Sequence, residues 1–171
     1  GDSIGLVRGL VEACVAEPSL AMVVDPHAVA KCLRAGVGAE LSLDLGHHLD
    51  PRWGLPLSLS GRILNSSDGR FRYTGGILGG SSVSMGPSVV FQYASIQILI
   101  MTYPTYDWAD EQYRSAGLDP LQVKFVGVKN MMNFRHGYPE AKACFVLDLP
   151  GPTPPDMRML NFARIQRPVF P

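Results

Sequence analysis

The segment 128–138 holds the side chains of this sequence that are best suited to recognising a charged ligand. It offers Lys129, Arg135 and His136 among methionine and aromatic residues, directly after an apolar run typical of a buried strand. Ligands of α/β proteins bind beyond the carboxyl ends of such strands, and an arginine can hold a carboxylate with two parallel hydrogen bonds. The same residues also fit a surface loop with a partly covered arginine, so both interpretations stay open.

A second cluster consists of residue types that bind metal ions. Asp44, His47, His48 and Asp50 lie within one short segment. Adjacent histidines on an extended chain point to opposite faces, and the spacing matches none of the helical zinc motifs. A loop with a turn at Asp50-Pro51 is the favoured interpretation. An independent metal-binding or small-molecule-binding domain is kept as an alternative.

Motifs for other chemistries are incomplete. The glycine-rich stretch 75–82 lacks the Gly-Lys-Ser/Thr ending of a phosphate-binding loop, which favours a bend between strands. Residues 80–84 lack the second glycine of a nucleophile elbow. We therefore assign no catalytic residue and no metal ligand to this chain.

Composition limits the function classes further. The chain has 171 residues, a formal net charge of +0, 46% hydrophobic and 18% charged residues, which indicates one globular domain. A neutral chain lacks the electrostatic surface expected of a nucleic-acid or anionic-membrane partner. The longest apolar stretch, 88–102, is interrupted by polar residues and too short for a membrane helix. Three cysteines without CxxC spacing predict buried free thiols in a reducing cytoplasm.

Hydrophobic periodicity predicts three helices, at 3–15, 26–35 and 106–116. The first would bury Leu6, Val7, Leu10, Val11 and Cys14, with an Arg8–Glu12 pair outside. The second has Asp25 as its cap, Pro26 as its first residue, Gly36 as its stop, and Val29, Cys32 and Leu33 as its buried stripe.

Strands are predicted at 20–24, 39–45, 57–62, 71–73, 89–93, 96–102, 121–128 and 144–149. A turn at 65–69 would pair 57–62 with 71–73, and 89–93 would form a hairpin with 96–102. Residues 130–141 are expected to be irregular or helical. The order of elements predicts an α/β or α+β fold, a single domain in which about three helices pack on a mixed β-sheet.

Several short sequence motifs occur in a characteristic order along essentially the whole chain. They are Gly1-Asp2-Ser3, Asp25-Pro26-His27-Ala28-Val29, Leu49-Asp50-Pro51-Arg52-Trp53-Gly54, Ser67-Asp68-Gly69-Arg70-Phe71, Gly117-Leu118-Asp119-Pro120, Val128-Lys129 through Phe134-Arg135, and Arg167-Pro168. Their order and spacing resemble the C-terminal domain of the microcystinase C (MlrC) family of zinc metallopeptidases.

The resemblance implies a function for residues 1–171 as the C-terminal domain of a bacterial, cytoplasmic zinc hydrolase that cuts small peptides. Zinc would lie in a larger N-terminal domain absent from this chain, so no cofactor is expected here. Arg135 first, then Lys129 and Asn133, become the candidate substrate-binding residues. Asn133 departs from the histidine usual in the family, and His48 replaces a usual lysine, which argues against an inherited metal role.

The partners implied by the resemblance are the N-terminal catalytic domain of the same protein and a peptide-like small substrate, with a homo-oligomer as a further option. Neither nucleic acid nor membrane is expected. The alternative is a structural or dimerisation module without a direct role in catalysis, with the apolar helix at 3–15 as part of its interface.

Overall fold

The computed structural model describes residues 3–48, 50–107, 109–130 and 134–151. It consists of a six-stranded sheet in the order β2-β3-β6-β7-β1-β8 and a separate two-stranded sheet, β4-β5. The strands are β1 (Ser19–Val24), β2 (Glu40–Leu45), β3 (Leu57–Ser67), β4 (Arg70–Arg72), β5 (Ser82–Ser84), β6 (Ser88–Tyr93), β7 (Ile96–Met101) and β8 (Phe125–Val126). The α-helices are α1 (Gly5–Glu12), α2 (Pro26–Ala35), α3 (Glu111–Ser115) and α4 (Phe134–Gly137). The predicted single α/β domain with a mixed sheet is confirmed.

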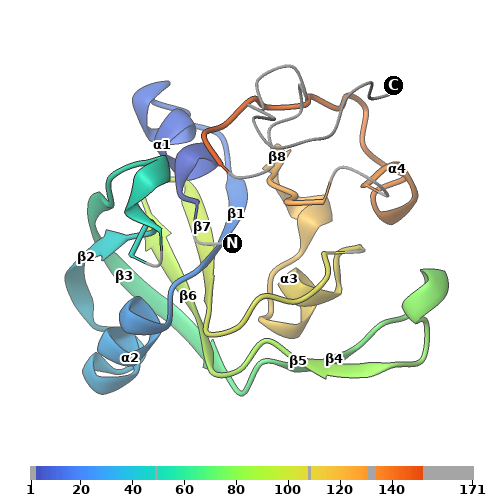
Figure 1. Ribbon diagram of the computed structural model, residues 1–171, viewed down its shortest axis with the longest axis horizontal. Coiled ribbons are helices and arrows are strands. Elements are labelled where there is room, and N and C mark those ends of the chain that lie inside the picture. The colour runs from blue at the N-terminus through green and yellow to red at the C-terminus, as the bar shows by residue number, and fades with distance from the viewer. Residues whose placement is uncertain (1–2, 49, 108, 131–133, 152–171) are drawn as a thin grey trace, which may run out of the picture.

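The sheet is mixed because β1 runs parallel to both of its neighbours, β7 and β8. The other pairs, β2 with β3, β3 with β6 and β6 with β7, are antiparallel. The carboxyl ends of β1, β7 and β8 therefore meet at one edge (Figure 1). Among the described residues, no helix is long and apolar enough to cross a bilayer.

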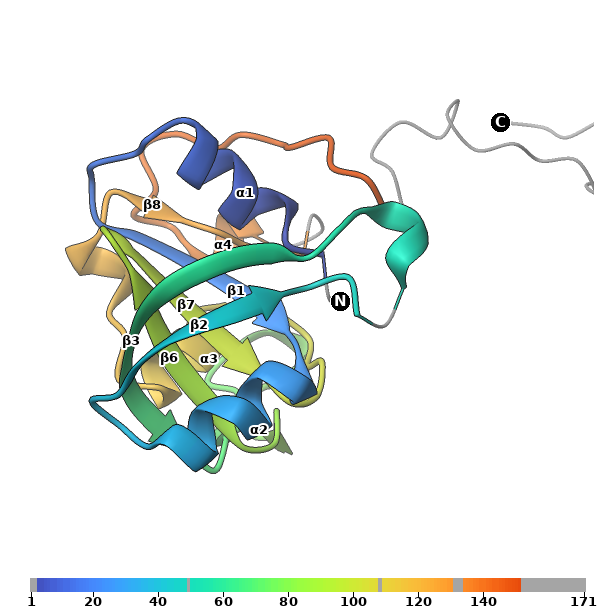
Figure 2. The ribbon, with the colours of Figure 1, turned by 90° about the vertical axis from the view of Figure 1, so that its left-hand side faces the viewer.

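Hydrophobic cores lie on both faces of this sheet. Helices α1 and α2 cover one face, where they bury Val7, Val29 and Cys32 against the strands; Figure 2 shows the two helices at its top and bottom with strands between them. The opposite face packs on Tyr113 of α3 and on Leu118. Every residue of β1 is buried, as expected of a strand covered on both faces.

Helix α2 follows its local signals. The Asp25 carboxylate accepts a hydrogen bond from the Ala28 amide at 2.9 Å, Pro26 occupies the first helical position, and Gly36 ends the helix with a φ of 86°. The predicted buried stripe is partly wrong, because Leu33 is 43% exposed and Ala28 is buried in its place. Strand β1 and the β6–β7 hairpin are also confirmed.

Helix α1 is shorter than the predicted helix at 3–15. It begins after Ile4 without a side-chain cap, and the chain leaves it through Cys14 in the left-handed region, with a φ of 50°. This conformation turns the chain back toward β1, so Cys14 is exposed rather than buried. Arg8 donates to the carbonyl oxygen of Leu55 at 2.7 Å, a contact that links α1 to the segment before β3.

The predicted hairpin between 57–62 and 71–73 is wrong. Strand β3 continues to Ser67 between β2 and β6, whereas β4 pairs with β5. A Cβ on Gly69 would lie 1.9 Å from the carbonyl oxygen of Gly86, so the chain passes directly over that backbone instead of folding back on β3. The predicted bend between strands is confirmed at the short 3₁₀ helix Gly76–Leu78, which joins β4 to β5.

Three further predictions were too long or wrong. The helix at 106–116 is reduced to α3, and the strand at 121–128 is split into the 3₁₀ helix Pro120–Gln122 and β8. The strand at 144–149 does not form, because no strand of the described residues pairs with it. Of the three thiols predicted to be buried, Cys32 is buried, whereas Cys14 and Cys144 are exposed.

Candidate functional site

The loops after β7 and β8 meet at the carboxyl edge of the parallel strands. The Asn130 side-chain amide donates to the carbonyl oxygen of Asp107 at 2.9 Å, and the Lys129 backbone amide donates to Asp107 Oδ2 at 2.9 Å. The buried Tyr113 hydroxyl donates to the carbonyl oxygen of Gly127 at 2.7 Å. These bonds fix the position of Lys129 relative to the sheet. We call Asp107, Glu111, Lys129, Asn130 and Tyr138 the carboxyl-edge site.

Lys129 supplies a positive charge at this site. Its side chain is exposed, and its ammonium group donates to the carbonyl oxygen of Ser3 at 2.7 Å. The first described residues of the chain therefore lie beside the site. A lysine ammonium is a compact charge that can attract a carboxylate without demanding one geometry.

Asp107 is the most perturbed acid of the site. It is 5% exposed, and burial raises the pKa of its carboxyl group to about 6, against the smaller lowering effects of the Lys129 amide and ammonium. Its second oxygen, Oδ1, is buried and without a hydrogen-bond partner among the described residues. Asp107 can therefore hold or release a proton close to neutral pH, as groups in functional sites often do.

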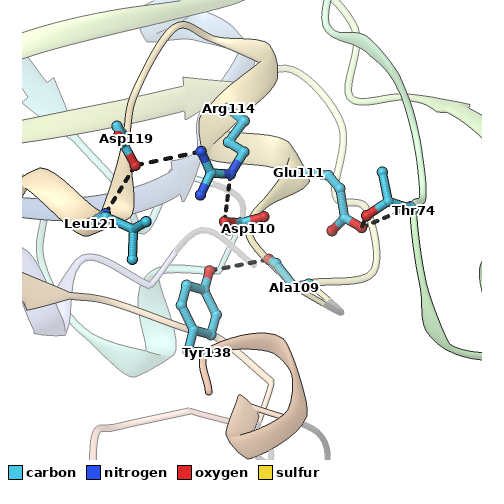
Figure 3. Close-up of polar contacts among 8 residues, drawn as sticks. All are labelled: Thr74, Ala109, Asp110, Glu111, Arg114, Asp119, Leu121 and Tyr138. Carbon is cyan, nitrogen blue, oxygen red and sulfur yellow. Dashed lines mark hydrogen bonds and ion pairs between the residues drawn. The ribbon is translucent and has the colours of Figure 1, made fainter. Parts of the chain in front are cut away.

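Glu111 lies beside Asp107 at the start of α3 and contacts the chain just after β4. Its Oε1 accepts from the backbone amide of Thr74 at 2.9 Å and from the Thr74 hydroxyl at 2.8 Å (Figure 3). Its Oε2 is buried and also has no partner among the described residues. Glu111 thus combines a structural bond with a second oxygen that is available inside the site.

Tyr138 closes the site from the side of α4. Its hydroxyl donates to the carbonyl oxygen of Ala109 at 3.1 Å (Figure 3). Burial raises the pKa of this hydroxyl far above its usual value, and the nearby Asp107 raises it further. Tyr138 therefore remains a neutral hydrogen-bond donor at every physiological pH.

An exposed ion-pair network holds the other end of α3. Arg114 contacts Asp110 at 2.6 Å and Asp119 at 3.5 Å, and Asp119 also accepts from the backbone amide of Leu121 (Figure 3). The network thereby links α3 to the 3₁₀ helix that precedes β8. Exposed pairs of this kind contribute little stability, so we assign them a positioning role.

The structure places the predicted binding residues differently from one another. Lys129 is part of the carboxyl-edge site, whereas Arg135 is exposed on α4, with its guanidinium carbon 5.1 Å from the centre of the Phe134 ring. Asn133 lies outside the described residues. Lys129 is thus the predicted cation that lies at the sheet edge, where its backbone amide is hydrogen-bonded to Asp107.

The predicted cluster of Asp44, His47, His48 and Asp50 makes contacts within a loop and to its neighbours. His48 Nε2 lies 2.8 Å from the carbonyl oxygen of Asp44 and 3.7 Å from the buried Asp25 carboxylate. His47 is buried against Gly54, while Asp50 accepts hydrogen bonds from Arg52 and Trp53, which confirms the predicted turn. Within the described ranges, no group of three histidine, cysteine or acidic side chains could hold a metal ion.

Asp107 and Glu111 were missed at the level of the sequence. Both follow the buried strand β7, which is the position that marked Lys129 after β8. The predicted helix at 106–116 included both residues without giving either a role, whereas α3 begins only at Glu111 and leaves Asp107 in the loop at the sheet edge. Acidic residues placed after a buried strand were the available signal.

Comparisons with known proteins identify a family and two related proteins. The family model described as "MlrC C-terminus" matches residues 1–164. Microcystinase C from Sphingomonas sp. is 26% identical over 138 residues, which are 81% of this chain and 26% of that protein. A crystal structure described as a "putative metallopeptidase" from Mesorhizobium sp. BNC1 has a TM-score of 0.88 and 20% identity, covering 100% of this chain and 34% of its own. The chain thus spans about a quarter to a third of the relatives it matches.

Proposed function

Because the chain belongs to the MlrC C-terminus family, as the order of its sequence phrases predicted, we propose that it is the substrate-positioning and structural domain of an MlrC-like, zinc-dependent hydrolase of peptides or related amides. In this proposal the chain is not catalytic by itself. Zinc, and the cleavage of the bond, belong to the remaining part of the longer protein. The name of the Sphingomonas relative and the description of the Mesorhizobium structure support the hydrolase class.

Lys129 is the residue on which the positioning role rests. Its exposed ammonium group stands at the carboxyl edge of the sheet, held by Ser3 and next to the buried Asp107. A carboxylate of a peptide-like substrate would find there a positive charge at the edge of the sheet, where it can orient the substrate. Arg135 offers a second exposed cation, and Asn133 completes the set proposed to contact substrate.

The bacterial cytoplasm is the compartment that we propose for the protein. The three cysteines are free thiols in the structure, two of them exposed. Exposed free thiols persist in a reducing compartment.

The test is the activity of the longer protein with Lys129→Ala and, separately, Arg135→Ala. For a peptide substrate with a free carboxylate, we expect kcat/KM to fall about 10- to 100-fold, because a charge-assisted hydrogen bond contributes about 1.5–3 kcal/mol. For the same peptide with its carboxylate converted to an amide, kcat/KM of these variants should differ little from that of the wild type. Arg34→Ala, an exposed arginine near the far end of α2, is the matched control and should keep full activity.

Full activity of both variants on the carboxylate substrate would overturn the positioning role. The domain would then act as a structural or dimerisation module, the alternative that its sequence also allows. Light scattering would report such a dimer directly.

A further inference from the structure

The segment 144–149, which we call the apolar segment, is exposed although its composition is typical of a buried strand. Phe145 is 79% exposed, Val146 62% and Leu147 49%. The segment runs past α1 as an extended trace in both ribbon views (Figures 1 and 2). Three consecutive large apolar side chains on a surface are unusual for a protein that acts alone and mark an interaction site.

The apolar segment is anchored at one end, beside the first residues of the chain. A Cβ on Gly5 would lie 3.1 Å from Leu149 Cδ2, so Leu149 packs directly on the backbone where α1 begins. Two residues earlier, the Ser3 carbonyl oxygen accepts the Lys129 ammonium. The start of the chain therefore passes between the carboxyl-edge site and the apolar segment.

We propose that the apolar segment is a docking strand for the N-terminal part of the longer protein, which it binds by pairing with the edge of a sheet. This inference rests on the proposed function, in which the chain is one domain of a larger hydrolase. The family model describes a C-terminus, and the chain covers 26% and 34% of the length of its two relatives. The partner that we propose for the apolar segment is therefore the large N-terminal part of the longer protein.

The chemistry of the segment selects the mode of docking. Side chains of an extended segment alternate between two faces, so Phe145 and Leu147 would share one face and Val146 the other. Added strands obtain affinity from main-chain hydrogen bonds and specificity from pockets for alternate side chains. The partner surface is therefore a strand edge flanked by apolar pockets.

The exposed thiol of Cys144, at the start of the segment, provides the test. In the longer native protein, alkylation of Cys144 should be at least about 10-fold slower than in the same protein unfolded in urea, as quantified by mass spectrometry of the labelled peptide. Phe145→Asp should restore the rate at Cys144. Ile77→Asp, which changes an 86% exposed side chain at the tip of the β4–β5 sheet, should not.

A Cys144 rate within about threefold of the unfolded rate would overturn the proposal, and this measurement needs no variant that might misfold. Protection that is lost on dilution would also overturn it, because a second copy of the protein would then be the occupant. The readout does not depend on catalysis. An exposed Cys144 combined with a loss of activity in Lys129→Ala would reject the docking strand and retain the proposed function.

Discussion

Asp107 shows how burial, with a smaller contribution from the neighbouring Glu111, raises the pKa of an ordinary carboxyl group to about 6. The loop after β7 places it 5% exposed, next to Glu111, with one oxygen bonded to the Lys129 amide and the other without a partner among the described residues. The ionised form loses its water and gains one hydrogen bond, so the neutral form is favoured. The site therefore carries a group whose charge can respond to a change in its surroundings.

This environment predicts a pH dependence of stability. The pKa of Asp107 is raised to about 6 in the folded state from 3.8. Its contribution to stability is therefore fully present below pH 4 and is lost as the pH rises through 6. We expect a loss of about 3 kcal/mol between these limits, since each pKa unit corresponds to about 1.4 kcal/mol.

Asp107→Asn should remove this dependence, because the amide keeps an acceptor for Lys129 and carries no charge. The variant should match the wild type near pH 4 and exceed its free energy of unfolding near pH 8, as measured by urea denaturation. Asp68→Asn, an exposed acid paired with Arg70, is the control and should leave the wild-type slope intact. An unchanged slope in Asp107→Asn would assign the titration to another carboxyl group.

Among the elements, β3 depends on a glycine for its close approach to β6. A Cβ on Gly61 would lie 2.0 Å from the carbonyl oxygen of Gln92 and 2.9 Å from the Phe91 ring. We expect Gly61→Ala to destabilise the protein by about 2–4 kcal/mol, because the strands must separate to accept a methyl group. Chemical denaturation of the purified chain measures this directly.

The matched control is Gly9→Ala in α1, where a Cβ would meet nothing within 4 Å. Alanine is the better helix former, so this variant should stabilise the chain by about 0.5–1 kcal/mol. Equal effects of the two substitutions would contradict the close packing of β3 on β6.

Elements with local signals were predictable from the sequence, and those that depend on distant partners were not. Helix α2 carries its cap, its proline and its terminal glycine within its own residues, and β6 and β7 are neighbours in the chain. The extension of β3 to Ser67 depends on its pairing with β6, which lies farther along the chain, and 144–149 has no strand partner among the described residues. At the site, the sequence motif pointed to Lys129, whereas Asp107, which also follows a buried strand, stands out by its burial in the structure.

The whole molecule combines a rigid centre with a weakly held edge that carries the candidate site. Ile98, Leu99 and Ile100 of β7 are 0% exposed, and β7 pairs along six positions with β1 on one side and β6 on the other. Strand β8, which leads to Lys129, pairs with β1 at only two positions. Local opening requires less free energy where fewer contacts are lost.

This contrast predicts two classes of backbone amides in hydrogen exchange. The amides of β7 should exchange last, and their opening free energy should fall steeply with added urea, because they open only when the whole chain unfolds. The amides around Phe125–Val126 should exchange at least about 100-fold faster, with little dependence on urea. Mass spectrometry or NMR of the chain at several urea concentrations separates the two classes. A single class with one urea dependence would mean that β8 is held as firmly as β7, and would contradict the weak attachment of this edge.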